Sequence, residues 1–387
     1  MVRKQNGNAI DDGITSATAV AADSLGFNGK TFATHWADQP LQVLLSDNAL
    51  WASLDWIRHG KFQSTRFEGA VTLNQMKETA RVLNGIEIAA EIKAEVAAEV
   101  RSLAQAGIRP GLAVVLVGHV AASEIYVRSK IKASGELGIR SEMLTPPETV
   151  TTEEMLALIA DLNARDEVDG ILIQLPLPAH VDTPRLLEAV SPEKDVDGFH
   201  PVNVGRLQSG HPALAPCTPA GIMEILRRSH LPVAGQHAVV LGRSQIVGKP
   251  AAMLLLNASA TVTVCHSKTV DIGRYTRDAD ILVAAIGRPG FVTAEMVKPG
   301  ATLIDVGINR LTDAADVARF FPGDAERAAH FKKRGSTLVG DIDPAAFALA
   351  GAYTPVPGGV GALTIAMLMH NTVQAAKARR VLAAVKV

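Results

Sequence analysis

The stretch His237-Ala-Val-Val-Leu-Gly-Arg-Ser-Gln-Ile-Val-Gly-Lys-Pro250 decides the fold of this chain of 387 residues. Its apolar start is typical of a buried strand, and the turn between Gly242 and Gly248 opens a helix. Gly242 permits a tight turn, Gly248 lets helix and strand pack closely, and backbone N–H groups at the helix start can meet a phosphate. The G-x-G-x-x-G spacing is incomplete, because Ser244 replaces the middle glycine. The setting nevertheless predicts a nucleotide-binding turn.

A glycine-rich turn alone is often only structural, but the runs that follow favour cofactor binding. Three further strands are predicted, at Thr261–His266, Asp280–Gly287 and Ala301–Gly307. This succession is typical of a Rossmann-like α/β domain.

The charges beside this turn favour one cofactor. A site for NAD usually ends its second strand with an acid, which binds the ribose 2′-hydroxyl. Here that strand ends in His266-Ser-Lys-Thr269, no acid follows before Asp271, and Arg243 lies in the turn itself. Cationic and hydroxyl groups suit a 2′-phosphate. We therefore predict NADP rather than NAD.

An earlier region also alternates helices with buried strands. The predicted helices are Ile86–Gln105, Ser123–Leu137 with Ser123 as N-cap, and Thr152–Asn163, and the predicted strands are Leu112–Val117 and Gly170–Leu175. Continuous apolar strands between helices indicate a parallel sheet covered on both faces.

These patterns predict an α/β fold with two domains. The first, a parallel-sheet catalytic domain, spans residues 76–215, and a C-terminal helix near Leu363–Lys377 completes it within 357–387. The second is Rossmann-like, spans 216–356 and begins with a helix at Ala220–Ser229, for which Thr218 is the expected N-cap. Leu311–Ser336 is expected to be a surface insertion with some helix.

Residues 1–75 differ in kind from the rest. They hold every tryptophan (Trp36, Trp51, Trp56) but little periodicity, so we expect a poorly ordered extension of unknown role. The segment lacks the apolar core of a secretory signal and is too rich in acids for a mitochondrial transit peptide. Our hypothesis is that the functional protein begins near Met76.

Composition excludes several classes of function. The formal net charge of −1 gives no basic excess for nucleic acid, and no apolar run approaches the roughly 20 residues that span a membrane. Cys217 and Cys265 lie far apart and have no neighbours at metal-ligand spacing. We therefore expect no metal site and no disulfide, and a cytoplasmic location.

Candidate catalytic residues lie at predicted strand ends and on one helix face. Tyr126 and Lys130 are four residues apart and share a face, although a packed Tyr beside a solvated Lys is the commoner explanation for such a pair. Gln174, at the end of a buried strand, needs a hydrogen-bond partner, which Lys130 could supply. Asp195 and Asp197 alternate, so only one need point into a cleft; alone, their loop could be a solvated acidic turn.

One more segment is unusually rich in glycine. Pro357-Gly-Gly-Val-Gly361 suits close approach of backbone to a ligand, or merely a tight turn before a helix.

Seven motifs together resemble the bifunctional methylenetetrahydrofolate dehydrogenase/cyclohydrolase family, from about Leu83 to the C-terminus. In chain order they are Tyr126-Val-Arg-Ser-Lys130, Asp169-Gly-Ile-Leu-Ile-Gln-Leu-Pro-Leu-Pro178, Lys194-Asp-Val-Asp-Gly198, Pro216-Cys-Thr-Pro219, Gly242-Arg-Ser-Gln-Ile-Val-Gly248, Asp305-Val-Gly-Ile-Asn309 and Pro357-Gly-Gly-Val-Gly361.

The resemblance implies a homodimer whose two domains enclose a folate cleft, acting in one-carbon metabolism. One step passes hydride from 5,10-methylenetetrahydrofolate to NADP, and a second hydrolyses the methenyl product to 10-formyltetrahydrofolate. It implies that Lys130 catalyses hydrolysis, Gln174 tunes it, Tyr126 stacks on the substrate and Asp197 anchors the pterin. The remaining implied contacts are Ile173, Leu175, Pro357, Gly358 and Gly359 for substrate, and Gly242, Arg243, Ser244, Ser267 and Ile308 for NADP.

The chain departs from the family in one motif. Ala362-Leu363 stands where the family usually has Pro-Met, an apolar exchange that we expect to affect loop rigidity more than chemistry. Two alternatives stay open: a relative with a single activity, and a non-catalytic module that binds NADP or folate. The presence of Lys130, Gln174 and Asp197 argues against both.

Overall fold

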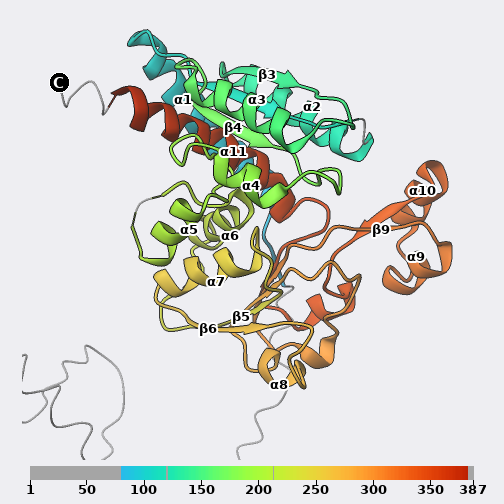
Figure 1. The fold of residues 1–387 in the computed structure, drawn as a ribbon. Coiled ribbons are helices and arrows are strands. Elements are labelled where there is room, and N and C mark those ends of the chain that lie inside the picture. The colour runs from blue at the N-terminus through green and yellow to red at the C-terminus, as the bar shows by residue number, and fades with distance from the viewer. Residues whose placement is uncertain (1–79, 119–120, 212, 382–387) are drawn as a thin grey trace, which may run out of the picture. The chain divides into compact units, whose positions relative to one another are not determined.

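The structure, a computed structural model, describes residues 80–118, 121–211 and 213–381 (Figure 1). The expectations for residues 1–75, and the start proposed near Met76, lie outside the described residues.

A three-stranded parallel sheet forms the centre of the first domain. Its order is β3-β2-β4, from β2 (Gly111–Val115), β3 (Arg140–Leu144) and β4 (Gly170–Ile173). The helices α1 (Gly85–Gln105), α2 (Ala121–Glu136) and α3 (Thr152–Ala164) connect and cover it. β2 and β4 are buried along their whole length, which explains their unbroken apolar runs. The predicted parallel sheet is confirmed.

A six-stranded parallel sheet forms the second domain, in the order β1-β11-β8-β7-β5-β6. Its strands are β1 (Arg81–Val82), β5 (His237–Leu241), β6 (Thr261–Cys265), β7 (Ile281–Ala284), β8 (Thr302–Asp305) and β11 (Ala352–Tyr353). Strand order reverses at β5, between β6 and β7, which is where open α/β sheets bind ligands. The Rossmann-like prediction is confirmed, although the strands end earlier than predicted because their last residues already form loops.

The remaining helices are short or flank this sheet. They are α4 (Thr183–Ala189), α5 (Pro201–Gln208), α6 (Cys217–Arg228), α7 (Gly248–Asn257), α8 (Gly273–Thr276), the 3₁₀ turns η1 (Ala294–Met296) and η2 (Pro344–Leu349), and the π turn η3 (Lys377–Val381).

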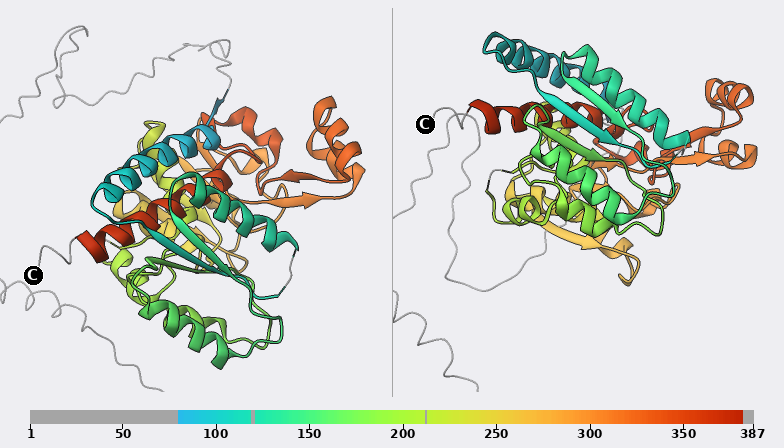
Figure 2. Two further views of the ribbon diagram at one scale, coloured as in Figure 1. Left: turned by 90° about the horizontal axis from the view of Figure 1, so that it is seen from above. Right: turned by 45° about the horizontal axis from the view of Figure 1, so that its top comes forward.

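The C-terminal helix α11 (Val360–Ala376) returns to the first domain and packs against α1 and α6 (Figures 1 and 2). Its buried Leu363, Met367 and Val373 share one apolar core with α1 and β2. The predicted return is confirmed, but the helix starts at Val360 rather than Leu363, directly after Gly359.

The predicted insertion is a pair of helices at the end of a hairpin (Figure 1, orange). Antiparallel β9 (Asn309–Leu311) and β10 (Thr337–Val339) carry α9 (Ala314–Phe320) and α10 (Ala325–Arg334) between them. Each helix has an aspartate N-cap, and buried Phe320 packs in a small core of its own.

Both predicted N-caps are wrong. α2 begins at Ala121, because two alanines extend it ahead of Ser123. α6 begins at Cys217 after Pro216, with no side-chain cap, and the Thr218 hydroxyl instead hydrogen-bonds Thr364 of α11 at 3.0 Å.

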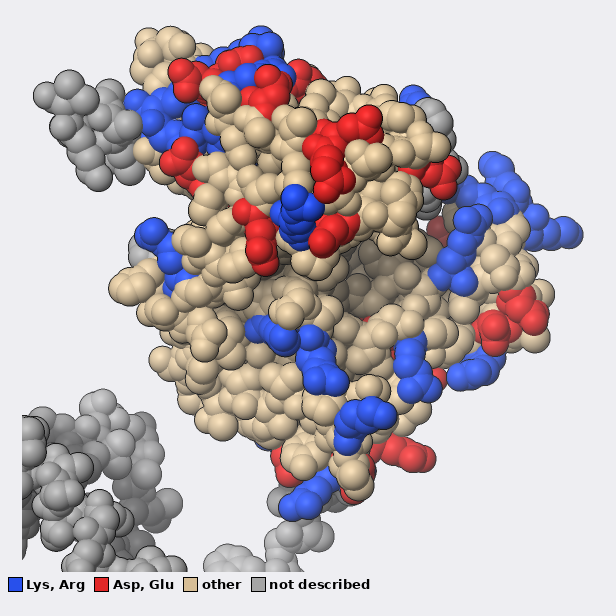
Figure 3. Space-filling view, in the orientation of Figure 1, with Lys and Arg blue, Asp and Glu red and all other residues tan. Residues whose placement is uncertain are grey.

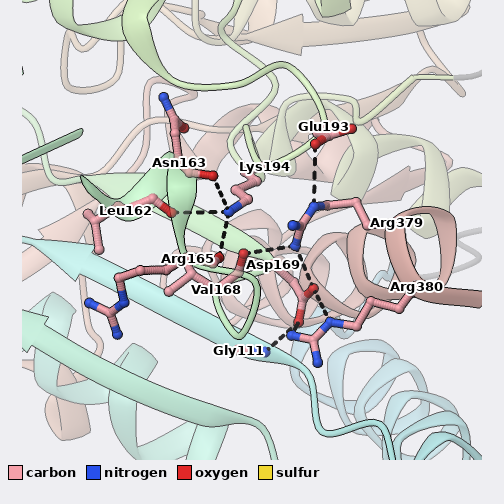
Figure 4. Close-up of polar contacts among 10 residues, drawn as sticks. All are labelled: Gly111, Leu162, Asn163, Arg165, Val168, Asp169, Glu193, Lys194, Arg379 and Arg380. Carbon is pink, nitrogen blue, oxygen red and sulfur yellow. Dashed lines mark hydrogen bonds and ion pairs between the residues drawn. The ribbon is translucent and has the colours of Figure 1, made fainter. Parts of the chain in front are cut away.

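Two buried charges anchor the first domain (Figure 4). The Lys194 side chain is 1% exposed, and its ammonium group donates to the carbonyl oxygens of Leu162, Asn163 and Arg165 at the end of α3. This position suits a cation, because carbonyls at a helix C-terminus lack intrahelical partners.

The second charge, the fully buried Asp169, precedes β4. Its carboxylate accepts from the Gly111 N–H at 2.9 Å and pairs with Arg379 at 2.8 Å and Arg380 at 2.7 Å. The turn after α11 is thus fastened to the start of β4, whose other end carries Gln174.

Candidate active site

A cavity of about 190 Å³ gathers most of the predicted catalytic residues. Its lining is Lys130, Ile173, Gln174, Leu175, Asp197, Phe199, Cys217, Thr218, Ile246, Val247 and Thr364. These residues come from α2, the end of β4, the loop after Lys194, α6, the loop after β5, and α11.

Lys130 and Gln174 are hydrogen-bonded partners within it. The Lys130 Nζ donates to Gln174 Oε1 at 3.0 Å, and Gln174 Nε2 donates to the Leu175 carbonyl at 2.7 Å. The predicted pairing of Lys130 with Gln174 is confirmed. Because the amide is held at both ends, it fixes the direction in which the amine points.

Asp195 and Asp197 have different roles. Asp195 is buried and accepts hydrogen bonds from the N–H groups of Phe199 and His200 and from Asn203, so it shapes the loop. Asp197 lines the cavity. Burial raises the pKa of Asp197 to about 6, although the positive charge of Lys130 opposes the rise. The Asp197 carboxyl and the Lys130 amine therefore line the same cavity.

Two contributors escaped the sequence reasoning. The Cys217 thiol donates to the Val196 carbonyl at 3.4 Å, and burial raises the pKa of this thiol. Asn371 of α11 donates to the carbonyls of Val196 and Ala215. The C-terminal helix therefore holds the loop that presents Asp197. The sequence signal that could have revealed this role of Asn371 is a polar Asn within an otherwise apolar helix.

Some predicted substrate residues lie outside this cavity. Tyr126, one helical turn before Lys130, is 52% exposed and is not part of the lining. Pro357 lines a separate cavity beside α10. Gly358 has a φ of 102°, and a Cβ on Gly85 would lie 2.1 Å from the Gly359 carbonyl oxygen. The close backbone approach at this loop is thus to the start of α1.

A second cavity, of about 320 Å³, surrounds the predicted nucleotide turn. It is lined by Leu241, Gly242, Arg243, Ser244, Cys265, His266, Ser267, Ile272, Ala285, Ile286, Arg288 and Phe291. Figure 3 shows Lys and Arg side chains beside the hollowed part of the surface.

The glycines of this turn behave as predicted. Gly242 has a φ of 114°, and a Cβ there would lie 2.2 Å from the Ala285 carbonyl oxygen. A Cβ on Gly248 would lie 2.2 Å from the Gly242 carbonyl oxygen. Ser244 Oγ accepts from the N–H groups of Val247 and Gly248, both at 3.2 Å, and so closes the turn.

The structure brings four of the five predicted cofactor residues together. Gly242, Arg243, Ser244 and Ser267 line the one cavity. Ile308 does not; it is 49% exposed, and its Cδ1 would lie 3.4 Å from a Cβ on Gly361. The donor set, with backbone N–H groups, hydroxyls and arginines, fits an anionic nucleotide.

One loop connects the two cavities. Gly242, Arg243 and Ser244 line the cofactor cavity, whereas Ile246 and Val247 of the same loop line the cavity of Lys130 and Gln174. A ligand that follows this loop from its phosphates would therefore reach the catalytic cavity with its other end.

Two buried aspartates hold loops around the cofactor cavity in place through backbone hydrogen bonds. The Asp341 carboxylate accepts from the consecutive N–H groups of Ile286, Gly287 and Arg288 at 2.7, 2.9 and 2.8 Å. Asp305 accepts from the N–H groups of Ile342, Asp341 and Gly307, yet burial raises its pKa to about 7.

Among the described residues, no helix is long and apolar enough to cross a membrane, and no cluster of His, Cys, Asp and Glu could hold a metal ion.

Comparison with known proteins identifies both domains. Residues 83–197 match the catalytic domain of tetrahydrofolate dehydrogenase/cyclohydrolase, and residues 216–380 match its NAD(P)-binding domain. The chain is 65% identical over 301 residues to the bifunctional protein FolD of Koribacter versatilis, an alignment covering 78% of this chain and 98% of that protein.

Solved structures agree as well. The bifunctional FolD enzyme from Campylobacter jejuni is 44% identical, with a TM-score of 0.71 over 78% of this chain and 99% of that one. The Trypanosoma brucei enzyme, solved with NADP and an inhibitor, is 40% identical, with a TM-score of 0.69 over 77% and 98%. The chain therefore belongs to the bifunctional methylenetetrahydrofolate dehydrogenase/cyclohydrolase family.

Proposed function

We propose that this chain oxidises 5,10-methylenetetrahydrofolate to the 5,10-methenyl form with NADP and then hydrolyses the product to 10-formyltetrahydrofolate. The observation that carries the proposal is the loop 242–248, which lines the cofactor cavity with one end and the catalytic cavity with the other. The family supports the same pair of activities.

In the first step the chain mainly aligns the reactants. NADP, when bound, accepts the hydride. Gly242, Arg243, Ser244 and Ser267 bind the nucleotide, and the exposed Ile308 adds an apolar contact. Asp197, ionised above a pKa of about 6, accepts hydrogen bonds from the N–H groups of the pterin. No protein base is needed, because the folate nitrogen supplies the electron pair.

In the second step Lys130 moves protons. Its amine takes a proton from the water that attacks the cationic methenyl carbon and then gives that proton to the nitrogen that leaves as the ring opens. Gln174 holds the amine in place through its 3.0 Å hydrogen bond. Ile173 and Leu175 contact the substrate inside the cavity, whereas Tyr126, Pro357, Gly358 and Gly359, which lie outside its lining, contact the part of the substrate that extends beyond it. The hydrogen-bonded pair of Lys130 and Gln174 favours a bifunctional enzyme over a single-activity relative.

We also propose the division of the chain. Residues 76–215 with 357–387 form the folate domain, which the packing of α11 on α1 supports, and 216–356 form the NADP domain. One short strand of the first span, β1, crosses this division, because it pairs with β11 in the sheet of the NADP domain. The chain acts as a cytoplasmic homodimer. The exposed edge of β6, with Val264 38% exposed, supports self-association, and two free cysteines suit a reducing compartment.

A coupled assay tests the function. Full-length protein is given methylenetetrahydrofolate and NADP, and the absorbances of NADPH and of the methenyl product are followed together. We expect NADPH to rise while the methenyl form stays low. Absence of NADPH formation would overturn the dehydrogenase, and methenyl accumulation equal to NADPH would overturn the cyclohydrolase.

A further inference from the structure

We propose that Arg288 is a further specificity-determining residue of the cofactor site, and that its guanidinium contacts the 2′-phosphate of NADP together with Arg243. The inference deepens the proposed function and rests on it.

The position of Arg288 follows from the sheet order. β7, β5 and β6 are neighbours, and the loops at their carboxyl ends line one cavity. They contribute Arg288, Arg243 and the pair His266–Ser267 respectively. A nucleotide whose phosphates lie on the loop after β5 is therefore flanked on one side by the Arg288 guanidinium and on the other by His266 and Ser267.

The charge of this cavity is one-sided. Among the residues that the structure describes, its lining contains Arg243, Arg288 and His266 but no Asp or Glu. Within the described part of the chain, neither arginine forms an ion pair or a side-chain hydrogen bond, whereas Arg165, Arg228 and Arg380 are all paired. Two unpaired guanidinium groups facing one cavity are suited to an added phosphate dianion, because a bidentate, charge-assisted bond is the strongest that arginine makes.

Arg288 is also held in place before any ligand arrives. Its backbone N–H donates to Asp341 Oδ1 at 2.8 Å, and its guanidinium lies 4.6 Å from the centroid of the Phe291 ring, which lines the same cavity. Asp341 is itself fixed by Asn309, whose amide donates to it at 2.9 Å. The loss of side-chain freedom on binding is correspondingly small.

A different role is physically possible for the same geometry. A guanidinium that lies flat on Phe291 could stack on the adenine ring, which NAD and NADP share. The two roles differ in one measurable respect: a phosphate contact discriminates between ligands with and without the 2′-phosphate, and a stacking contact does not.

The test measures binding without turnover. Adenosine 2′,5′-bisphosphate and AMP are titrated by calorimetry into the wild-type full-length chain and into Arg288→Gln. The matched control is Arg274→Gln, which also removes a guanidinium placed over an aromatic ring, Tyr275, but outside the cavity lining. We expect Arg288→Gln to weaken the bisphosphate about tenfold and AMP less than about twofold, and Arg274→Gln to match wild type.

Salt gives a second readout. The difference between wild type and Arg288→Gln should shrink as ionic strength rises, because the contact is between charges. Equal weakening of both ligands, or no weakening of the bisphosphate, would overturn the inference. Failure of the proposed function has a different signature: wild type would form no NADPH from methylenetetrahydrofolate, whatever the binding data show.

Discussion

The catalytic cavity and the cofactor cavity recognise their ligands by different means. In the catalytic cavity the polar groups are paired with each other: Lys130 with Gln174, and Asp197 close enough to Lys130 for their charges to interact. In the cofactor cavity the backbone provides the shape, and Arg243 and Arg288 form no ion pair or side-chain hydrogen bond with any described residue. Chemistry thus depends on a few buried side chains, and cofactor recognition depends on backbone geometry plus accessible charge.

The largest expected effect comes from removing the catalytic amine. Lys130→Met should lower cyclohydrolase activity about a thousandfold, because no other lysine is among the described residues that line the cavity, while NADPH formation continues. The measurement is the rate of methenyl consumption. Lys132→Met, an exposed lysine on the same helix, serves as control and should match wild type. Full hydrolysis by Lys130→Met would remove the amine from the mechanism.

The second-largest effect is expected from removing the two arginines that pair with Asp169. Arg379→Met combined with Arg380→Met should lower the free energy of unfolding by about 3 kcal/mol, because it leaves the buried Asp169 carboxylate without its two ion pairs. Urea denaturation measures this.

The loss of stability should depend on pH. Burial raises the pKa of Asp169, while the Gly111 N–H, Arg380 and Arg379 oppose the rise, so without the arginines the pKa should rise further. A carboxyl whose folded pKa is raised is destabilising when ionised, so the deficit should be larger at neutral pH and shrink as acid protonates Asp169. An equal loss of unfolding free energy at neutral and at acid pH would assign the effect to packing instead.

The cofactor cavity can be tested through its backbone. Gly242→Ala should weaken adenosine 2′,5′-bisphosphate about a hundredfold, because the added Cβ would meet the Ala285 carbonyl oxygen at 2.2 Å. Gly235→Ala is a matched control: its φ of 76° is similarly restrictive, but no atom lies within 4 Å of the added Cβ. If both variants bind alike, backbone strain rather than the close approach would explain the loss.

The smallest expected effect is the pH dependence of the KM for methylenetetrahydrofolate. Because Asp197 has a pKa of about 6, its charge is present above that pH and lost below it. The KM for methylenetetrahydrofolate should therefore rise about tenfold between pH 7 and pH 5, whereas the KM for NADP should not follow the same curve. Asp197→Asn should show a flat profile, and an equally steep one would assign the titration to another group.

Much of this comparison could be predicted from sequence, since it rests on local pattern. The buried strands, the Gly242–Gly248 turn and the pairing of Lys130 with Gln174 all followed from apolar runs and strand ends. β3 was missed because an edge strand with the polar sequence Arg140-Ser-Glu-Met-Leu144 has no buried-strand signal. The two-residue strands β1 and β11 are too short for any periodicity.

Long-range contacts explain the other differences. The Thr218 hydroxyl looked like a helix cap but bonds Thr364 from a distant helix. Asp341 lies in a hairpin base yet holds the loop of Arg288, a contact that no local pattern encodes. Asn371 likewise fixes the loop of Asp197 from the C-terminal helix.

The central claim is that the loop 242–248 places the reacting end of the cofactor in the cavity of Lys130, Gln174 and Asp197. A crystal structure of the full-length chain with NADP and an unreactive folate analogue tests it most directly. We predict the nicotinamide beside Ile246 and Val247, with its C4 facing the folate and the pterin on Asp197. A nicotinamide directed away from this cavity would contradict the account.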